Sequence, residues 1–558
     1  MDRNTLLAIA LSLAVMVGWS MYQARFSPPP RETVSEEAHA PLTEKPPSPP
    51  AAVTPQPKEL GTPPPPPPPS MGEERIVRFE EPLYVAEFTT RGAGLLRWQL
   101  RTYNQGPAGD YAPIVMTMES EPVEPTLLTP FAELGLGDLA QAIFEIESQD
   151  EAGVSFRYSQ NGITVRKAYT FDDDSYSFRL RLEVENGSAS PVAPEFGVEW
   201  PAAKRNTQDF KDEAFVVFHG GKVQKHRVAS LGRAGLLGSI FKRGPVTEPE
   251  YSGDVDWAGI QTTYFLGVLL PDNPALARVK IETVKAGDSG IADISFPAVQ
   301  LRSGQSTDQQ FRAYLGPKEE KRLERIGSDT VRSIDTGYSW IKPLVLGFSW
   351  LLLALYSIIP NYGVAIIVLT VLVRVVTMPL TNRQMRSMER MRAVQPKVKA
   401  LQEKHGDDRQ KQSEEMMKLY RAEGVNPLGG CFPMLLQLPV FIGLFYALRS
   451  SIHLRQAPFV GWINDLSAPE TLFTIPGIEI PVRVLPLVMG VSMVVQQKIT
   501  PTASADPAQA RMMMTIMPVM MTVLFYQFPS GLVLYWFVSN LLAITHQLLI
   551  GRRIRGGK

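Results

Sequence analysis

Hydrophobic and polar side chains alternate with a period of two in residues 76–326. In the stretch "SYSFRLRLEVEN" every second residue is apolar, namely Tyr176, Phe178, Leu180, Leu182 and Val184. Successive side chains of a strand point to opposite faces of its sheet, so this pattern predicts a strand with one buried face. The preceding "ITVRKAYTF", joined through "DDDS", predicts a hairpin. Three further stretches, "LYVAEFTTRGAG", "FGVEWP" and "TTYFLGVLLP", predict more strands. We therefore expect a soluble, mostly β domain of the sandwich type, and a short helix over 318–326 leading out of it.

From residue 337 the pattern changes to long apolar stretches. After a first one at 341–359, five candidate membrane spans follow, at 362–380, 428–448, 482–497, 512–527 and 531–550. An earlier apolar run, 5–22, is long enough to cross about 30 Å of hydrocarbon at 1.5 Å per residue. No small-residue cleavage site directly follows that run, so we expect an uncleaved anchor. The fold class predicted is a polytopic α-helical membrane protein with six spans and an extracytoplasmic β domain.

The count of six depends on how the segment 341–359 lies. It is nearly long enough to span, and only "PN" separates it from the next stretch. Its aromatic and basic residues are typical of a helix that lies in the membrane interface: Tyr338, Trp340, Lys342, Trp350 and Tyr356. The residues alone leave both interpretations open.

Composition and charge divide the chain further. Residues 28–70 contain 17 prolines, which predicts an extended, semi-rigid tether. Residues 382–426 have helical periodicity, a "HGDD" break, and 11 Lys or Arg against 7 Asp or Glu, as expected for a helical hairpin in water. The tail "GRRIRGGK" has four basic residues. The excess of positive charge places hairpin and tail in the cytoplasm, which puts the β domain outside and the N-terminus inside.

Arg374 is the only charged residue between Tyr362 and Leu380. A charge in hydrocarbon costs roughly 3 kcal/mol on insertion scales. Arg374 lies six residues from Leu380, about 9 Å along a helix, so its side chain could snorkel to the cytoplasmic headgroups. Alternatively, it faces a wet cavity with Thr370, one turn earlier, and with polar residues of later spans: Gln437, Gln496, Gln497, Ser539, Asn540 and Gln547.

Other chemistry is sparse in the sequence. Cys431 is the only cysteine, so no intramolecular disulfide forms, and the six histidines have no metal-ligand spacing. No P-loop, GxSxG or HExxH motif is present, and no cofactor, metal or specific nucleic-acid site is expected. Six methionines lie between 512 and 521. Flexible, polarizable methionines suit a surface that accepts many apolar sequences, although ordinary core filling is the simpler explanation.

Four stretches carry a resemblance to a known family: "TVLVRVVTMPLT", the segment from "MRAVQPKVKAL" to "GGCFPMLLQLPVF", "LRQAPFVGWINDLSAP" and "FPSGLVLYWFVSNLLAITHQ". They closely resemble the YidC family of membrane protein insertases over roughly 337–550. The anchor, tether and β domain resemble the Gram-negative form of that family, with six spans and a periplasmic domain of the β-super-sandwich type. The resemblance makes 341–359 an interfacial helix.

The resemblance also implies a mechanism. Five spans would surround a hydrophilic groove, open to the cytoplasm and lipid, in which Arg374 attracts the polar tail of an incoming nascent membrane protein. The candidate groove residues are Arg374, Thr370, Gln437, Ser539 and Tyr535. The apolar segment would leave along a hydrophobic slide, whose candidates are Met513, Met517, Met520 and Met521. Expected partners are nascent membrane proteins, membrane lipid and the Sec translocon, with the ribosome and the signal recognition particle receptor as further candidates.

The protein is expected in the bacterial inner membrane, and these expectations divide the chain into eight segments: anchor 1–26, tether 27–75, β domain 76–326, lead-in and interfacial helix 327–360, second span 361–381, cytoplasmic hairpin 382–426, spans three to six 427–550 and basic tail 551–558.

Two functions of other classes remain as alternatives. One is a small-solute channel or transporter that uses Arg374 as an anion site, although no inverted repeat is visible. The other is a membrane-tethered carbohydrate enzyme or binder acting through the β domain.

Overall fold

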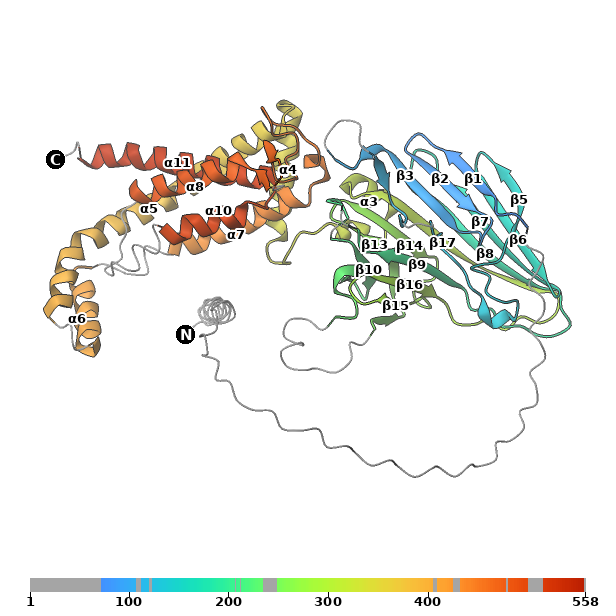
Figure 1. Cartoon of the computed structure of the whole chain (residues 1–558). Coiled ribbons are helices and arrows are strands. Elements are labelled where there is room, and N and C mark those ends of the chain that lie inside the picture. Colours follow the sequence, from blue (N-terminus) through green and yellow to red (C-terminus); the bar gives the residue numbers. More distant parts are fainter. Residues whose placement is uncertain are drawn as a thin grey trace, which may run out of the picture. The chain divides into compact units, whose positions relative to one another are not determined.

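The structure is a computed structural model, shown in Figure 1. It describes residues 72–106, 112–119, 123–205, 207–210, 212–233, 248–404, 409–424, 432–477, 480–499 and 515–555. The predicted anchor 1–26 and almost all of the tether 27–75 lie outside the described residues, as do the tail residues 556–558 and Met513.

The β domain contains three antiparallel sheets in its described residues. The largest has nine strands, in the order β11 (Lys222–Arg227), β10 (Ala214–His219), β13 (Val255–Gln261), β14 (Phe265–Pro271), β17 (Gln305–Pro317), β8 (Ser177–Asn186), β7 (Ile163–Phe171), β6 (Gly153–Gln160) and β5 (Glu145–Asp150). A second sheet has the order β12 (Glu250–Ser252), β15 (Arg278–Lys285), β16 (Ser289–Ser295) and β9 (Gly197–Ala203). The third consists of β1 (Ile76–Glu80), β2 (Tyr84–Thr89), β3 (Leu95–Asn104) and β4 (Pro113–Val115).

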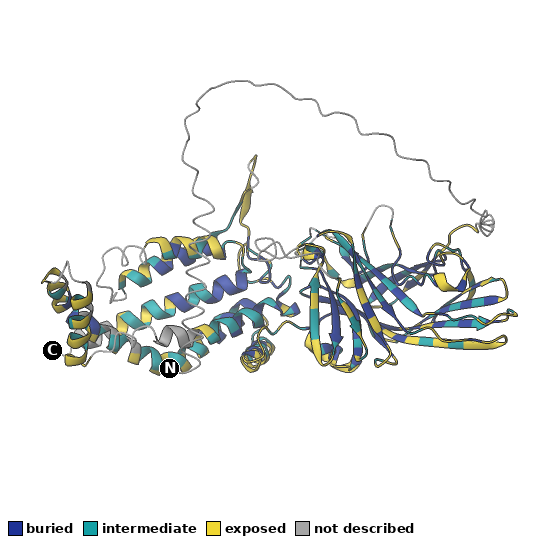
Figure 2. Ribbon diagram, turned by 90° about the horizontal axis from the view of Figure 1, so that it is seen from below, coloured by how far each residue is buried: buried dark blue, intermediate teal, exposed yellow. Residues whose placement is uncertain are grey.

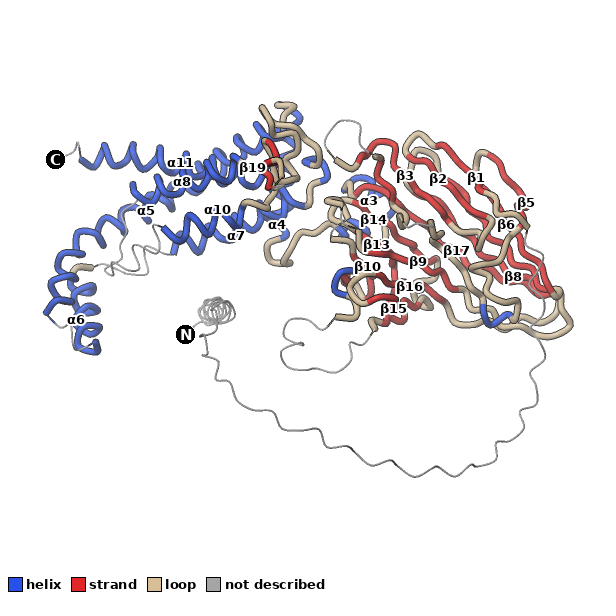
Figure 3. Tube along the Cα trace, in the orientation of Figure 1, coloured by secondary structure: helices blue, strands red, loops and turns tan. Residues whose placement is uncertain are grey.

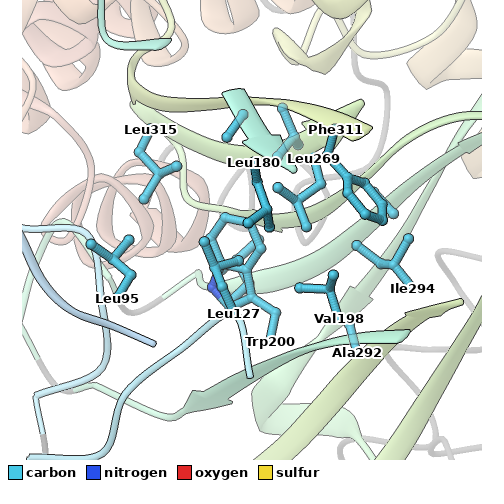
Figure 4. Close-up of a cluster of buried hydrophobic side chains, with 14 of the residues drawn as sticks. Leu95, Leu127, Leu180, Val198, Trp200, Leu269, Ala292, Ile294, Phe311 and Leu315 are labelled. Atoms are coloured by element: carbon cyan, nitrogen blue, oxygen red, sulfur yellow. The ribbon is translucent and has the colours of Figure 1, made fainter. Parts of the chain in front are cut away.

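The predicted hairpin is confirmed as β7 and β8, which pair from Ile163 opposite Asn186 to Phe171 opposite Phe178. Along β8 the apolar residues are fully buried and the arginines between them are exposed. The buried faces of different sheets meet in one core. Leu180, Leu269 and Phe311 of the nine-stranded sheet lie against Val198, Trp200 and Ile294 of the β9–β16 sheet (Figure 4). Sheets packed face to face in this way form a sandwich, so the predicted class of the domain is confirmed.

The C-terminal part of the chain is helical. After α3 (Glu320–Ile326), which confirms the predicted short helix, come α4 (Lys342–Ile358), α5 (Tyr362–Lys404), α6 (Arg409–Ala422), α7 (Phe432–Arg449), α8 (Val484–Ile499), α10 (Met517–Phe525) and α11 (Ser530–Arg555). In the described residues after α3, the only strands are a short hairpin of β18 (Phe473–Ile475) and β19 (Ile480–Val482), which the sequence analysis did not predict (Figure 3).

Helix α5 differs from the predicted division at residue 381. It continues without a break through 43 residues, so the second span and the first arm of the predicted hairpin are one helix. Pro379 and Pro396 lie inside it. The apolar stretch ends near Leu380, but good helix formers follow, and a change from apolar to polar residues marks a change of solvent, not the end of a helix.

The helices expose apolar side chains, as lipid-facing helices do. Val375, Val376, Val491 and Val523 are each at least 60% exposed, and Figure 2 shows many exposed positions on these helices. Two helical stretches in the described residues, Tyr362–Met391 and Ser530–Leu549, are long and apolar enough to cross a membrane. Lys342–Ile358, Leu438–Arg449 and Val484–Ile499 are shorter apolar helices. The count of six spans therefore stays a prediction.

Candidate functional site

Arg374 points into the helical bundle and is bonded to α11. Its Nε donates to the Ser539 hydroxyl (3.2 Å), and Nη2 donates to both the hydroxyl (2.7 Å) and the carbonyl oxygen (2.9 Å) of Ser539. Among the described residues, no acceptor contacts Nη1 and no acidic side chain pairs with the guanidinium. The side chain is therefore bonded to a neighbouring helix through Ser539. Its charge is held in place but is not neutralised by a described partner.

The residues next to Arg374 have the opposite environment. Val375 is 60% exposed and Val376 is 79% exposed, so this side of α5 is an uncovered apolar surface. A helix turns 100° per residue, which places Arg374 on the flank between the uncovered side and the packed side. That position explains why Arg374 is only partly buried while Ser539, its partner, is buried.

Two of the predicted groove residues lie deeper in the packing. Thr370 is almost completely buried, and its hydroxyl donates to the carbonyl of Ile366 in its own helix (2.6 Å). Tyr535 is also buried, one turn before Ser539 on α11, and packs in the same hydrophobic cluster as Leu369 and Ile366. Whether Thr370 and Tyr535 contact a substrate remains a prediction.

Polar contacts continue from Ser539 between α11 and α8. Asn540 donates to the Ser492 hydroxyl (3.0 Å), which itself donates to the carbonyl of Met489 (2.6 Å). Gln547 donates to the carbonyl of Ile499 (3.3 Å). Asn540 and Gln547 are recognisable in the sequence as polar residues of a span, whereas Ser492 is not singled out there. Its signal was weak, because a lone serine in an apolar helix usually bonds to its own backbone.

Three polar atoms in this part of the bundle are buried without a partner in the described residues: Asn382 Oδ1, Gln497 Oε1 and His546 Nε2. Buried acceptors without protein partners are normally hydrogen-bonded to water. They lie on α5, α8 and α11, the same three helices that hold Arg374, Ser492 and Ser539. This arrangement suits a hydrated space between the helices.

The predicted slide residues have mixed environments. Met520 is exposed, while Met517 and Met521 are partly buried, and Met521 packs against the hydrophobic cluster of the bundle. Val519 and Val523 of α10 are also exposed, so α10 presents an apolar face to lipid. Gln437 lies on α7, but its side chain is outside the described residues.

Ion pairs connect the β domain with the segment that follows α7. Arg455 donates to both carboxylate oxygens of Asp209, from Nε to Oδ1 (2.7 Å) and from Nη2 to Oδ2 (2.8 Å), and both side chains are buried. Arg449 of α7 pairs with Asp212 (3.0 Å), where both side chains are partly exposed. In the described residues, no group of three or more His, Cys, Asp or Glu side chains is arranged to hold a metal ion.

The chain combines an antiparallel β sandwich with helices that expose apolar side chains, and Arg374 lies among those helices without a described counter-ion. This combination defines a membrane protein with a large domain outside the bilayer. The family described as "60Kd inner membrane protein" matches residues 354–557, and the "YidC periplasmic domain" matches residues 76–351. The chain belongs to the family of membrane protein insertases named YidC.

Curated relatives support this membership over the whole chain. A "Membrane protein insertase YidC" from Pelobacter propionicus is 33% identical over 99% of this chain and 100% of its own length. Relatives of the same name from Syntrophus aciditrophicus and Citrifermentans bemidjiense are 32% identical (99% of this chain, 100% of the relative) and 36% identical (86% of each chain). The chain is thus an inner-membrane protein with a periplasmic domain, and the channel alternative has no support from these matches.

Proposed function

We propose that this chain inserts integral membrane proteins into the inner membrane and helps them to fold, and that Arg374 receives the polar tail of each incoming substrate. The name of its relatives gives the activity. The observation that carries the role of Arg374 is its guanidinium, fixed by Ser539 yet without a described counter-ion. At an effective dielectric constant near 20, an acidic group 4 Å away would gain about 4 kcal/mol from such a charge.

Insertion then follows from the arrangement of the bundle. A tail carrying carboxylates enters the hydrated space from the cytoplasm, and the Arg374 charge reduces its desolvation cost. The apolar segment that follows leaves along α10, where Met520, Val519 and Val523 are exposed. Burial in lipid contributes about 25 cal/mol per Å² of apolar surface, so no nucleotide is needed to drive the step.

The charge distribution supports the orientation. Residues 382–426 and the basic tail 551–558 lie in the cytoplasm in this proposal, together with the N-terminus, because basic residues are retained on that side. Nascent chains would arrive there from the ribosome, with the signal recognition particle receptor and the Sec translocon as expected partners. Six spans, including the predicted anchor, satisfy this orientation if α4 lies in the interface.

Arg374→Ala tests the proposal in reconstituted insertion of a small substrate with an acidic extracytoplasmic tail. We expect insertion to fall about tenfold or more, since a favourable ion pair of several kcal/mol is lost, and Arg374→Lys to retain most of it. Arg383→Ala is the matched control, because it removes one exposed arginine from the same helix. A second control neutralises the substrate's tail, after which Arg374→Ala should make little difference. Full activity of Arg374→Ala on the acidic substrate would refute the role of the charge.

A further inference from the structure

A pocket of about 420 Å³ lies between α4, the segment after α7 and the end of the β domain. One wall is α4. The stretch after α3, including Val331, Arg332 and Ile334, forms another wall, and further lining comes from residues 450–453 and from Val223, Lys318 and Glu320. All its lining residues belong to the described part of the chain. The pocket is separate from Arg374, and insertion as proposed above does not use it.

The α4 wall has an amphiphilic pattern. Lys342, Leu346, Ser349 and Leu353 line the pocket and follow each other at spacings of four, three and four residues, which places them on one helix face. The cation is at the first turn of the helix, and the two leucines, 40% and 37% exposed, follow it. Over 11 residues this wall extends about 16 Å. A ligand along it would meet a positive charge first and hydrocarbon afterwards.

Three basic side chains line the pocket, among them the exposed Lys342. Lys318, Arg332 and Lys342 line the pocket together with one acid, Glu320, and with His453. Lys318 is not available to a ligand, because its Nζ already donates to Gln261 Oε1 and to two backbone carbonyls. Arg332 pairs with Asp329 (3.0 Å), although about half of its side chain is exposed.

Lys342 is exposed and has no partner among the described residues. Four serines also line the pocket, Ser339, Ser349, Ser450 and Ser451, of which Ser450 already donates its hydroxyl to the carbonyl of Tyr446 (2.6 Å). An ammonium group with nearby hydroxyls is a suitable site for a phosphate.

We propose that this pocket binds one negatively charged diacyl phospholipid from the periplasmic leaflet. Its phosphate lies against Lys342 and the neighbouring Ser339, and one acyl chain follows Leu346 and Leu353. The position of the pocket beside exposed aromatic residues of α4 favours a lipid over a soluble ligand. Trp340, Trp350 and Tyr338 at the beginning and on the outer side of α4 are at least 60% exposed, and exposed aromatic residues of this kind mark the headgroup region.

The test titrates the delipidated full-length protein in detergent with dioctanoyl phosphatidylglycerol and counts bound lipid by native mass spectrometry. We expect one tightly bound lipid. Lys342→Glu should weaken its binding at least about tenfold, the usual effect of losing one charge-assisted contact. Lys321→Glu, on the exposed side of α3 and not in the pocket, should not. Leu346→Trp should fill the apolar end and also weaken binding, whereas Leu344→Trp, an exposed α4 position outside the pocket, should not.

The outcomes separate the sources of the phosphate. Inorganic phosphate or glycerol 3-phosphate should fail to displace the lipid at millimolar concentration; displacement would show a soluble-anion site and overturn the proposal. Unchanged lipid binding in both Lys342→Glu and Leu346→Trp would overturn it as well, and so would an equal loss in Lys321→Glu. Each variant is used only after its thermal unfolding matches the wild type, and Lys342→Gln replaces Lys342→Glu if that variant is unstable.

Discussion

Removing Asp209 should loosen the connection between the β domain and the segment after α7 far more than removing Asp212. Asp209 is buried with Arg455 in a bidentate pair at 2.7 and 2.8 Å, and Arg455 also donates to the carbonyl of Asn104. Its guanidinium lies over the ring of Phe265, 5.4 Å from the centroid. Asp209→Ala would leave a buried guanidinium without its counter-ion, which costs about 3–5 kcal/mol.

The Asp212 pair is the internal control. It joins the same two parts of the chain through the same residue types, but its side chains are 40% and 27% exposed. Solvent-exposed pairs contribute about 0.2–1 kcal/mol. The assay is chemical unfolding of the full-length protein in detergent, with a spin-label pair across the two parts to report separation by pulsed electron resonance. We expect Asp209→Ala to lower strongly the denaturant concentration at which half of the molecules have separated parts. Asp212→Ala should change this concentration little.

The double variant distinguishes pairing from packing. Arg455→Met with Asp209→Leu removes both charges and keeps most of the volume, so it should recover most of the loss seen in Asp209→Ala. Equal effects of Asp209→Ala and Asp212→Ala would refute the argument from burial. If the double variant separates at the same denaturant concentration as Asp209→Ala, the ion pair contributes a net stabilisation that exceeds the cost of desolvating its two charges.

Two further predictions concern the β domain. Burial lowers the pKa of Lys167 to about 7, and its Nζ donates to the carbonyls of Gly92 and Leu127. Between pH 7 and the ordinary pKa near 10.5, only the unfolded chain binds this proton. The free energy of unfolding should therefore rise with pH by up to about 1.4 kcal/mol per unit, a slope that Lys167→Met should remove in fluorescence-monitored unfolding at pH 7–9. Deleting residues 80–310 should leave insertion active in reconstituted vesicles, because Arg374 and Ser539 lie outside them; loss of insertion by a stable, abundant deletion variant would contradict this.

Local patterns predicted several of the strands and the helical character of the C-terminal part, but not how these elements are arranged. The alternation in β7 and β8 is a property of neighbouring residues, and it predicted their pairing correctly. The pairing of β17 with β8 joins residues more than 100 positions apart, and no local signal encodes it. The same limit applies to β18 and β19, three residues each, which are too short for a period to appear.

The site could be predicted in part. Arg374 stands out because a charge in an apolar stretch is costly, and Ser539, on a helix 165 residues away, is one of several polar residues of later spans that the sequence offers as neighbours. The depth of Thr370 could not be predicted, because it depends on how α5 is rotated against α11. Of the three residues with a buried polar atom and no partner, Gln497 is marked by the sequence as a polar residue of a span. Asn382 and His546 give no such signal, because their burial depends on how the helices pack against one another.

Because α5 is continuous, it can transmit a displacement along its whole length. At 1.5 Å per residue its 43 residues extend about 65 Å, from Tyr362 through Arg374 to Lys404, so displacement of one end reaches the other without a loop to absorb it. The helix is most easily bent at Pro379. This proline cannot donate to the carbonyl of Val375, and it lies five residues beyond Arg374. A force on the part of α5 beyond Pro379 would bend the helix at this proline first, and the angle of that bend would set how far the guanidinium turns.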